Sequence, residues 1–163
     1  MHQRSVLALV LVFVLSAATA AGAEEPRRIQ PVVTIGALEV LTFDHGHDGL
    51  YASAAGGALF PIGQYASLIP TLGAEWAPEN GHWGAVATLT FDQPLAEWIG
   101  ADLNLILGED HSGNDFSNAL LFAGIGLGPS FYFGSFVLSP SANWFPGPGG
   151  GAIVPSLFGS YAF

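Results

Sequence analysis

The amino-acid sequence predicts an all-β fold, an eight-stranded antiparallel up-and-down barrel that crosses a membrane. Apolar residues alternate with small or polar ones over eight segments, the connections between the segments alternate in length, and only 10% of the residues are charged. Soluble globular domains carry roughly 25% charged residues. A tilted strand crosses a bilayer with about 9–11 residues, a length that each of the eight segments reaches.

The first four segments are assigned from the spacing of their apolar residues. Residues 30–43 are apolar on both faces, so Glu39 is the residue that indicates which face avoids lipid. Residues 50–60 are rich in Ala and Gly, and both registers stay open for them. In residues 65–76 and 82–92, apolar residues occupy every second position, which is the period of a strand with one apolar face.

The last four segments show the same period. Residues 98–108 place Leu103, Leu105 and Leu107 on one face, and Asp102 and Asn104 on the other. Residues 120–129 set Leu and Ile against glycines, 131–144 set apolar residues against Ser and Asn, and 152–163 close the barrel. Single-chain bacterial barrels have an even number of strands. Twelve strands would leave too few residues for strands and loops together.

The connections fall into two groups. Residues 61–64, 93–97 and 128–130 are short, whereas 44–49, 78–81, 109–118 and 145–151 are longer or more polar. Bacterial transmembrane barrels have short turns on the periplasmic side and longer loops outside. With a periplasmic N-terminus, the polar group lies outside the cell.

The first 23 residues predict a cleaved signal peptide. Arg4 precedes an apolar run, 6–15, and small residues lead up to Ala23. As a helix this run would rise about 15 Å, which is too short for a hydrocarbon core of about 30 Å and disfavours an uncleaved anchor. Residues 24–163 are then the exported barrel domain, without a Lys or Arg after Arg28.

Composition excludes other classes of protein. The chain has no Cys, which rules out a disulfide scaffold or a zinc–thiolate site. With 3 Lys+Arg against 13 Asp+Glu, it is not expected to bind nucleic acid. A soluble exported barrel or sandwich is the main alternative fold, but its outer face would carry charges, and here the polar face carries Ser, Thr, Gly, Asn and a few acids.

We expect the lumen to be filled by side chains, as in other barrels of eight strands, and not to form a general diffusion pore. The candidate inward residues are Glu39, Tyr65, Glu75, Val86, Thr88, Trp98, Asp102, Asn104, Ile106, Phe122, Phe131, Phe133, Ser139 and Asn143. Without basic partners, Glu39 and Asp102 must be protonated, hydrogen-bonded, hydrated or bound to a cation. A narrow channel for small hydrophobic molecules is an alternative, because the lumen is partly apolar.

His and acidic residues gather in the predicted outer loops. Asp44, His45, His47 and Asp48 form one candidate metal site, and His82 and His111 are further candidate ligands. Imidazole and carboxylate suit Zn²⁺, whereas carboxylates alone suit Ca²⁺ or Mg²⁺. No cofactor is required, and solvated loop residues are the simpler interpretation.

The closing segment, 153–163, ends in Phe163 after alternating apolar positions. In this the chain resembles the small outer-membrane β-barrels of Gram-negative bacteria, the eight-stranded OmpA/OmpX-like class. The resemblance implies a monomer in the outer membrane, recognition of the last strand by the barrel-assembly machinery, and contact with lipid and lipopolysaccharide. It also implies a porin-like architecture in the cell envelope.

Some barrels of this class modify lipid A as acyltransferases or deacylases, which is the enzymatic alternative. His82, His111, Ser112 and Asp110 could serve as base, nucleophile and orienting group. A glycine-flanked loop would hold Ser112 poorly, so we assign no catalytic residue and expect no enzymatic activity.

Overall fold

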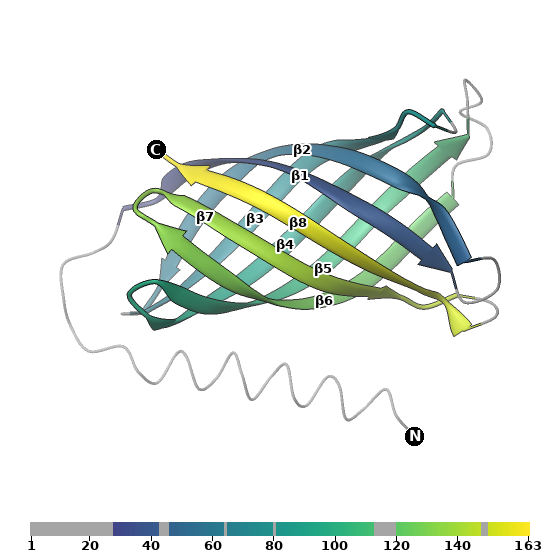
Figure 1. Ribbon diagram of the computed structural model, residues 1–163. Coiled ribbons are helices and arrows are strands. Elements are labelled where there is room, and N and C mark those ends of the chain that lie inside the picture. Colours follow the sequence, from purple (N-terminus) through teal and green to yellow (C-terminus); the bar gives the residue numbers. More distant parts are fainter. Residues whose placement is uncertain (1–27, 43–45, 64, 80, 113–119, 148–149) are drawn as a thin grey trace.

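The computed structural model describes residues 28–42, 46–63, 65–79, 81–112, 120–147 and 150–163, which form one closed antiparallel barrel (Figure 1). Its strands are β1 (Gln30–Thr42), β2 (Gly46–Ile62), β3 (Ala66–Ala77), β4 (His82–Ala96), β5 (Ile99–Ser112), β6 (Leu120–Phe133), β7 (Phe136–Phe145) and β8 (Ala152–Ala162). Each strand pairs with the next, and β1 closes the barrel by pairing with β8. The predicted fold class is confirmed. The predicted signal peptide, 1–23, lies outside the described residues.

The barrel has two different ends (Figure 1). The short-turn end carries the connections 63–65, 97–98 and 134–135 together with the C-terminus, and the long-loop end carries the other four connections. Gly134 has a φ of 66°, a conformation that residues with a side chain rarely adopt, and it allows the tight turn between β6 and β7. The backbone N–H of Ala162 donates to the carbonyl of Ser135 at 3.0 Å, which holds the last strand at this end.

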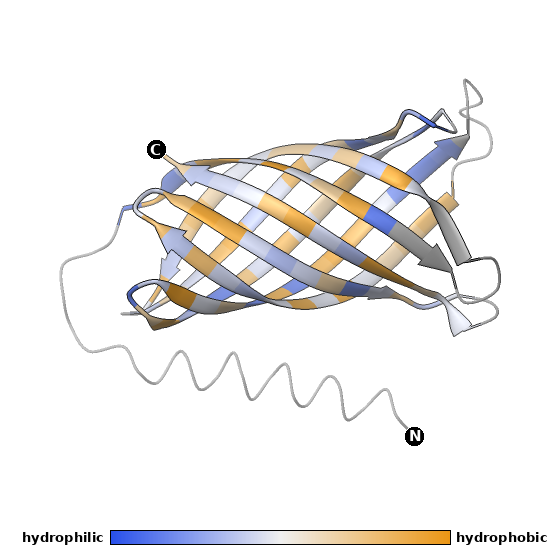
Figure 2. Cartoon of the chain, viewed as in Figure 1, coloured by the Kyte–Doolittle hydropathy of each residue, from blue (hydrophilic) through white to orange (hydrophobic). Residues whose placement is uncertain are grey.

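The alternation on β5 is oriented as predicted. Leu105 and Leu107 are 42% and 62% exposed, whereas Asp102 and Asn104 are 5% and 8% exposed. Figure 2 shows the same change between apolar and polar residues along the strands. Leu103 has the outward parity of Leu105 but is buried, because it packs in a surface cluster with Ala66 and Phe91. On β5, apolar side chains therefore face outward and polar ones enter the lumen.

The lumen near the long-loop end is filled with apolar side chains. Leu38, Tyr51, Ala77 and Val154 form a buried cluster, with Phe145, Ala152 and Phe158 packed against it. The Phe145 ring lies over Gly124, where an added Cβ would come within 2.4 Å of it, and Phe122 meets Phe145 edge to face at 5.4 Å. The glycines on the inner face thus provide the space that the aromatic rings fill.

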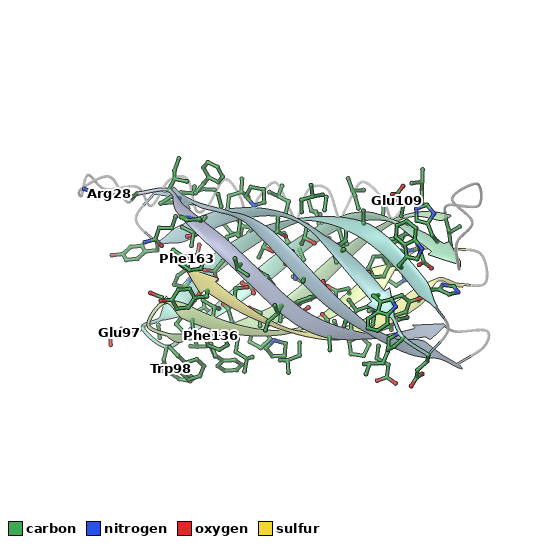
Figure 3. The ribbon with its side chains drawn as sticks, turned by 90° about the horizontal axis from the view of Figure 1, so that it is seen from above. Arg28, Glu97, Trp98, Glu109, Phe136 and Phe163 are labelled. Atoms are coloured by element: carbon green, nitrogen blue, oxygen red, sulfur yellow. The ribbon has the colours of Figure 1, made fainter. Side chains whose placement is uncertain are left out.

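Five of the residues predicted to face inward do not: Glu39, Tyr65, Trp98, Phe131 and Phe133. Thr34 and Leu38 are residues of β1 that face inward. Glu39 has the opposite parity, which it shares with the exposed Val33 and Ile35, so it lies on the outer face. Tyr65 and Trp98 were predicted to face inward, but both are exposed at short turns. Figure 3 shows Trp98 pointing away from the barrel.

The faces of residues 131–133 were also predicted in reverse. Ser130 and Tyr132 face inward, where their hydroxyls bond with Asp92, and Phe133 is exposed. The prediction was wrong because it placed a turn at residues 128–130, where proline suggested a break. Instead, β6 runs on to Phe133, and the alternation that begins with its glycines continues through Tyr132.

Several strands are longer than predicted. Residues 46–49 belong to β2, residues 109–112 to β5, and residues 93–96 to β4. The predictions ended these strands at polar residues and at proline. Cross-strand pairing continues through them, since Glu109 pairs with Leu121 and Asp110 with Leu120. The acidic residues at the end of β5 are therefore held on a strand and not on a loop.

Candidate functional site

A hydrogen-bonded polar group in the lumen lies near the short-turn end, and we call it the aspartate cluster: Asp92, Asp102, Ser130, Tyr132 and Ser139. Asp92 Oδ1 accepts hydrogen bonds from Ser130 Oγ at 3.0 Å and from the Tyr132 hydroxyl at 2.5 Å. The two donors lie on β6, two strands away from β4. They reach Asp92 because Gly100, on the intervening β5, has no side chain to block them.

Asp102 is the second carboxyl group of the aspartate cluster. It is the register partner of Asp92 across β4 and β5. Its carboxyl lies within hydrogen-bonding reach of Ser139, Ser130 and the carboxyl of Asp92. Its Oδ1 atom is buried and has no hydrogen-bond partner.

Further polar groups line the lumen and form hydrogen bonds between neighbouring strands. Thr90 Oγ1 donates to Asn104 Oδ1 at 2.8 Å. Asn143 Nδ2 donates to Ser156 Oγ at 2.8 Å and to the carbonyl of Val154 at 3.1 Å. Together with the aromatic rings at the long-loop end, these groups occupy the interior of the barrel. Glu75, Val86, Asn104, Ile106, Phe122, Ser139 and Asn143 have the inward parity predicted for them.

A second charged group lies at the long-loop end, where β4 and β5 meet. His82 Nδ1 lies 2.8 Å from Asp110 Oδ2, and both residues have inward parity. Glu75 on β3 adds a second carboxyl close enough to interact electrostatically with Asp110. Asp110 Oδ1 is buried and has no hydrogen-bond partner.

His111 lies on the opposite face of β5 from Asp110. Its ring stacks on Trp83 with centroids 4.4 Å apart, and its Nε2 lies 3.4 Å from Glu109 Oε1. Figure 3 shows Glu109 near the long-loop end. His82 and His111, both predicted as metal ligands, therefore point to different sides of the sheet and cannot share one ion.

The other predicted metal ligands cannot be placed as a site. Asp44 and His45 lie outside the described residues, as do the side chains of His47 and Asp48, whose backbone belongs to β2. Within the described part of the chain, no three His, Asp or Glu side chains are arranged to hold a metal ion. Ser112 is the backbone register partner of His82, and its side chain is outside the described set.

Exposed aromatic side chains gather at both ends of the barrel. The short-turn end carries Phe60, Tyr65, Trp98, Phe133, Phe136, Tyr161 and Phe163, and the long-loop end carries Trp76 and Trp144. At the short-turn end they contact one another, with Phe133 and Phe136 at 6.4 Å and Tyr161 and Phe163 at 4.9 Å. Two belts of this kind flank the apolar band of transmembrane barrels. Among the described residues, no helix is long and apolar enough to span a membrane.

Sequence reasoning did not find three members of the aspartate cluster, Asp92, Ser130 and Tyr132. Asp92 is the last residue of the segment predicted over residues 82–92 and has the parity of Thr88 and Thr90. The signal for Ser130 and Tyr132 was the glycine alternation at 124, 126 and 128, which continues through both residues. That signal was hidden by Pro129, which suggested a turn.

No protein-family model matches the chain, and no curated protein matches its sequence. Solved structures do match its fold. The N-terminal β-barrel domain of Pseudomonas aeruginosa OprF has a TM-score of 0.54 at 16% identity and covers 83% of this chain and 100% of its own. The Yersinia pestis outer membrane protein Ail, in a phospholipid bilayer nanodisc, has a TM-score of 0.54 at 13% identity with the same coverage.

A designed transmembrane β-barrel matches as well, with a TM-score of 0.54 at 10% identity, over 87% of this chain and 100% of its own. At these identities the likeness concerns the fold. The chain has the fold of the small transmembrane β-barrels, among them the outer-membrane barrels of OprF and Ail.

Proposed function

We propose that this chain is an integral outer-membrane β-barrel protein of a Gram-negative bacterium, without catalytic activity and with a lumen filled by its own side chains. The observation that carries the proposal is the distribution of polarity: apolar side chains are exposed around a closed barrel whose interior holds carboxyl, amide and hydroxyl groups. In water this arrangement would leave a large apolar surface exposed. In a bilayer, the same surface faces hydrocarbon.

The orientation of the barrel follows from its two ends. Transmembrane barrels have short periplasmic turns and longer extracellular loops, so the short-turn end belongs in the periplasm. The exposed Phe163 then lies at the periplasmic end, where the barrel-assembly machinery would bind the last strand. The long-loop end would face the lipopolysaccharide leaflet.

The filled lumen supports a closed barrel in place of a pore. Apolar rings occupy the long-loop half, and the aspartate cluster with its neighbouring hydrogen bonds occupies the other half. An eight-stranded barrel has an interior only wide enough for its own side chains. A structural or surface-contact role in the envelope fits this interior better than general diffusion.

Three measurements test the proposal. Protein refolded in detergent should migrate faster on a gel before heating than after it, and it should require detergent or lipid to stay soluble. Planar bilayers containing it should show no large steady conductance. Free solubility without detergent would contradict the membrane assignment, and a steady large conductance would contradict the filled lumen.

The long-loop end is our candidate for divalent cations. Barrel contacts to anionic lipopolysaccharide cannot use Lys or Arg here, since none follows Arg28. Bridging Ca²⁺ or Mg²⁺, or Zn²⁺ at Asp44, His45, His47 and Asp48, would supply the missing positive charge. Calorimetric titration of each ion into wild type and His45→Ala/His47→Ala tests this, with equal binding by both proteins as the contradicting result.

The His82–Asp110 contact supports a second candidate function, modification of lipid A. A carboxylate at Nδ1 orients an imidazole so that Nε2 can act as a base. Lipid A from cells that express wild type should then differ in acylation from lipid A of cells that express His82→Ala. Identical lipid A mass spectra with wild type, His82→Ala and no expression would reject this candidate.

A further inference from the structure

The aspartate cluster contains two carboxyl groups and no basic side chain. Asp92 and Asp102 are cross-strand partners, and both are buried. The polar groups around them are Ser67 on β3, the register partner of Asp92, Ser130 and Tyr132 on β6, and Ser139 on β7, none of which carries positive charge. No Lys or Arg follows Arg28, which precedes the barrel. Two ionised carboxylates held together in this interior would repel each other, and water could not screen them.

The hydrogen bonds distinguish the two carboxyl groups. Asp92 Oδ1 accepts from both the Tyr132 hydroxyl and Ser130 Oγ, as an ionised carboxylate does. Asp102 has the hydroxyls of Ser139 and Ser130 within reach, but Ser130 Oγ donates to Asp92, and the buried Oδ1 of Asp102 accepts no hydrogen bond. The carboxyls of Asp102 and Asp92 nevertheless lie within hydrogen-bonding reach of each other. A hydrogen bond between two carboxyl groups requires a proton on one of them.

We propose that Asp102 is a neutral carboxylic acid that donates its proton to the carboxylate of Asp92, so that the pair binds one proton in the closed barrel. The inference depends on the closed barrel alone, and it stands whether or not the membrane assignment holds. The proton performs the neutralising role that a Lys or Arg would otherwise have. One negative charge remains, and the hydroxyls of Tyr132 and Ser130 stabilise it on Asp92.

This proton makes the stability of the barrel depend on pH. In the unfolded chain an aspartic acid is ionised above about pH 4, so near neutral pH the folded state binds one proton more than the unfolded state. Stability must then fall as the pH rises over this range, because the unfolded chain gives up a proton that the folded state keeps. The short-turn half of the lumen, where the cluster lies, should loosen first.

Infrared spectroscopy of the full folded barrel in detergent, in D₂O, tests where the proton is. Wild type at neutral pH should show the C=O band of a neutral carboxylic acid. The band should be lost in Asp102→Asn and retained, with a shift, in Asp92→Asn. The control Glu97→Gln, at the exposed turn beside β5, should leave the band unchanged. A band unaffected by Asp102→Asn, or one lost only in Asp92→Asn, would overturn the proposal.

The pH dependence of unfolding tests the same proton in a second way. The urea midpoint of wild type should fall from mildly acidic to mildly alkaline pH, and Asp102→Asn should remove most of that fall while Glu97→Gln keeps it. If Asp102→Asn does not fold, Glu75→Gln replaces it: the acid band must persist in this variant, in which the other buried carboxyl pair is altered, and it must disappear reversibly as the pH rises. The proposal would be refuted if wild type lacked the acid band and its urea midpoint shifted on addition of Ca²⁺ or of a chelator. A metal cation, and not a proton, would then occupy the pair.

Discussion

The hydroxyl of Tyr132 on β6 donates a hydrogen bond to Asp92 Oδ1 on β4, passing over the backbone of Gly100 on β5. The two residues are 40 positions apart in the sequence and two strands apart in the barrel. Their contact exists because the strand between them has no side chain at that point. This one contact therefore joins β4 to β6 across β5 at the short-turn end of the lumen.

Replacing Gly100 with alanine should break this contact. An added Cβ would lie 2.0 Å from the Tyr132 hydroxyl and 2.6 Å from Ser130 Oγ, so both donors would have to move away from Asp92. We expect the free energy of unfolding to fall by about 1–3 kcal/mol, as measured by urea titration in detergent.

Gly56→Ala is the matched control for this prediction. It adds the same methyl group at an outward position, where the nearest atom outside the adjoining residues is the Val32 carbonyl oxygen at 4.0 Å. Its stability should stay close to that of wild type. Equal losses of stability in the two variants would show that the Tyr132 and Ser130 side chains do not need the space above Gly100.

Tyr132→Phe should lower stability by about 1.5–3 kcal/mol, the usual range for a hydrogen bond to a charged group. The ring remains, but Asp92 loses one of its two hydroxyl donors. Tyr65→Phe removes a hydroxyl from an exposed side chain at a short turn and should have little effect. The comparison uses equilibrium unfolding of both variants under the same conditions, and an equal effect of the two would contradict the role of Tyr132.

The sequence predicts the barrel well because alternation is a local property. The face of Leu105 and Leu107, the number of strands and the alternating connections can all be read from residues that are neighbours in the chain. Burial of Asp102 and Asn104 could be predicted for the same reason: they occupy the positions between leucines that face outward. A two-residue period determines one face of a strand once the other is known.

The contacts inside the lumen could not be predicted in this way. The bond between Asp92 and Tyr132 depends on which strands lie on either side of β5, on the cross-strand register and on the absence of a side chain at Gly100. Local reasoning also failed where two signals competed. Pro129 suggested a turn, although proline is compatible with a strand that continues to Phe133. The charge of Glu39 suggested an inward face, although Glu39 lies close to the end of β1.

Leu105→Arg should test whether the outer face of the barrel contacts lipid. Leu105 is exposed in the middle portion of β5, and a charged residue near the bilayer midplane costs a transmembrane barrel about 2–4 kcal/mol. Leu95→Arg, close to the short turn at the end of β4, should cost about 0–1 kcal/mol because it lies near the interface. Folding into phospholipid vesicles, followed by urea titration, measures both. Equal costs at the two positions would argue against a membrane-embedded surface.

A matched pair of leucine substitutions should separate the inside of the barrel from its outside. Leu38 is buried in the apolar cluster of the lumen with Tyr51 and Val154, whereas Leu127 is exposed on the outer face of β6. Leu→Ala removes the same atoms in both cases, so both variants lose the free energy of transferring those atoms out of water. At Leu38 the substitution also leaves a cavity, because the surrounding strands are held by the closed barrel and cannot collapse fully. At Leu127 a lipid chain fills the space.

In vesicles we therefore expect Leu38→Ala to cost more than Leu127→Ala by about 1–2 kcal/mol, the size of a typical cavity contribution. A larger cost at Leu127 would mean that its side chain is packed within protein, which is incompatible with a lipid-facing surface on β6.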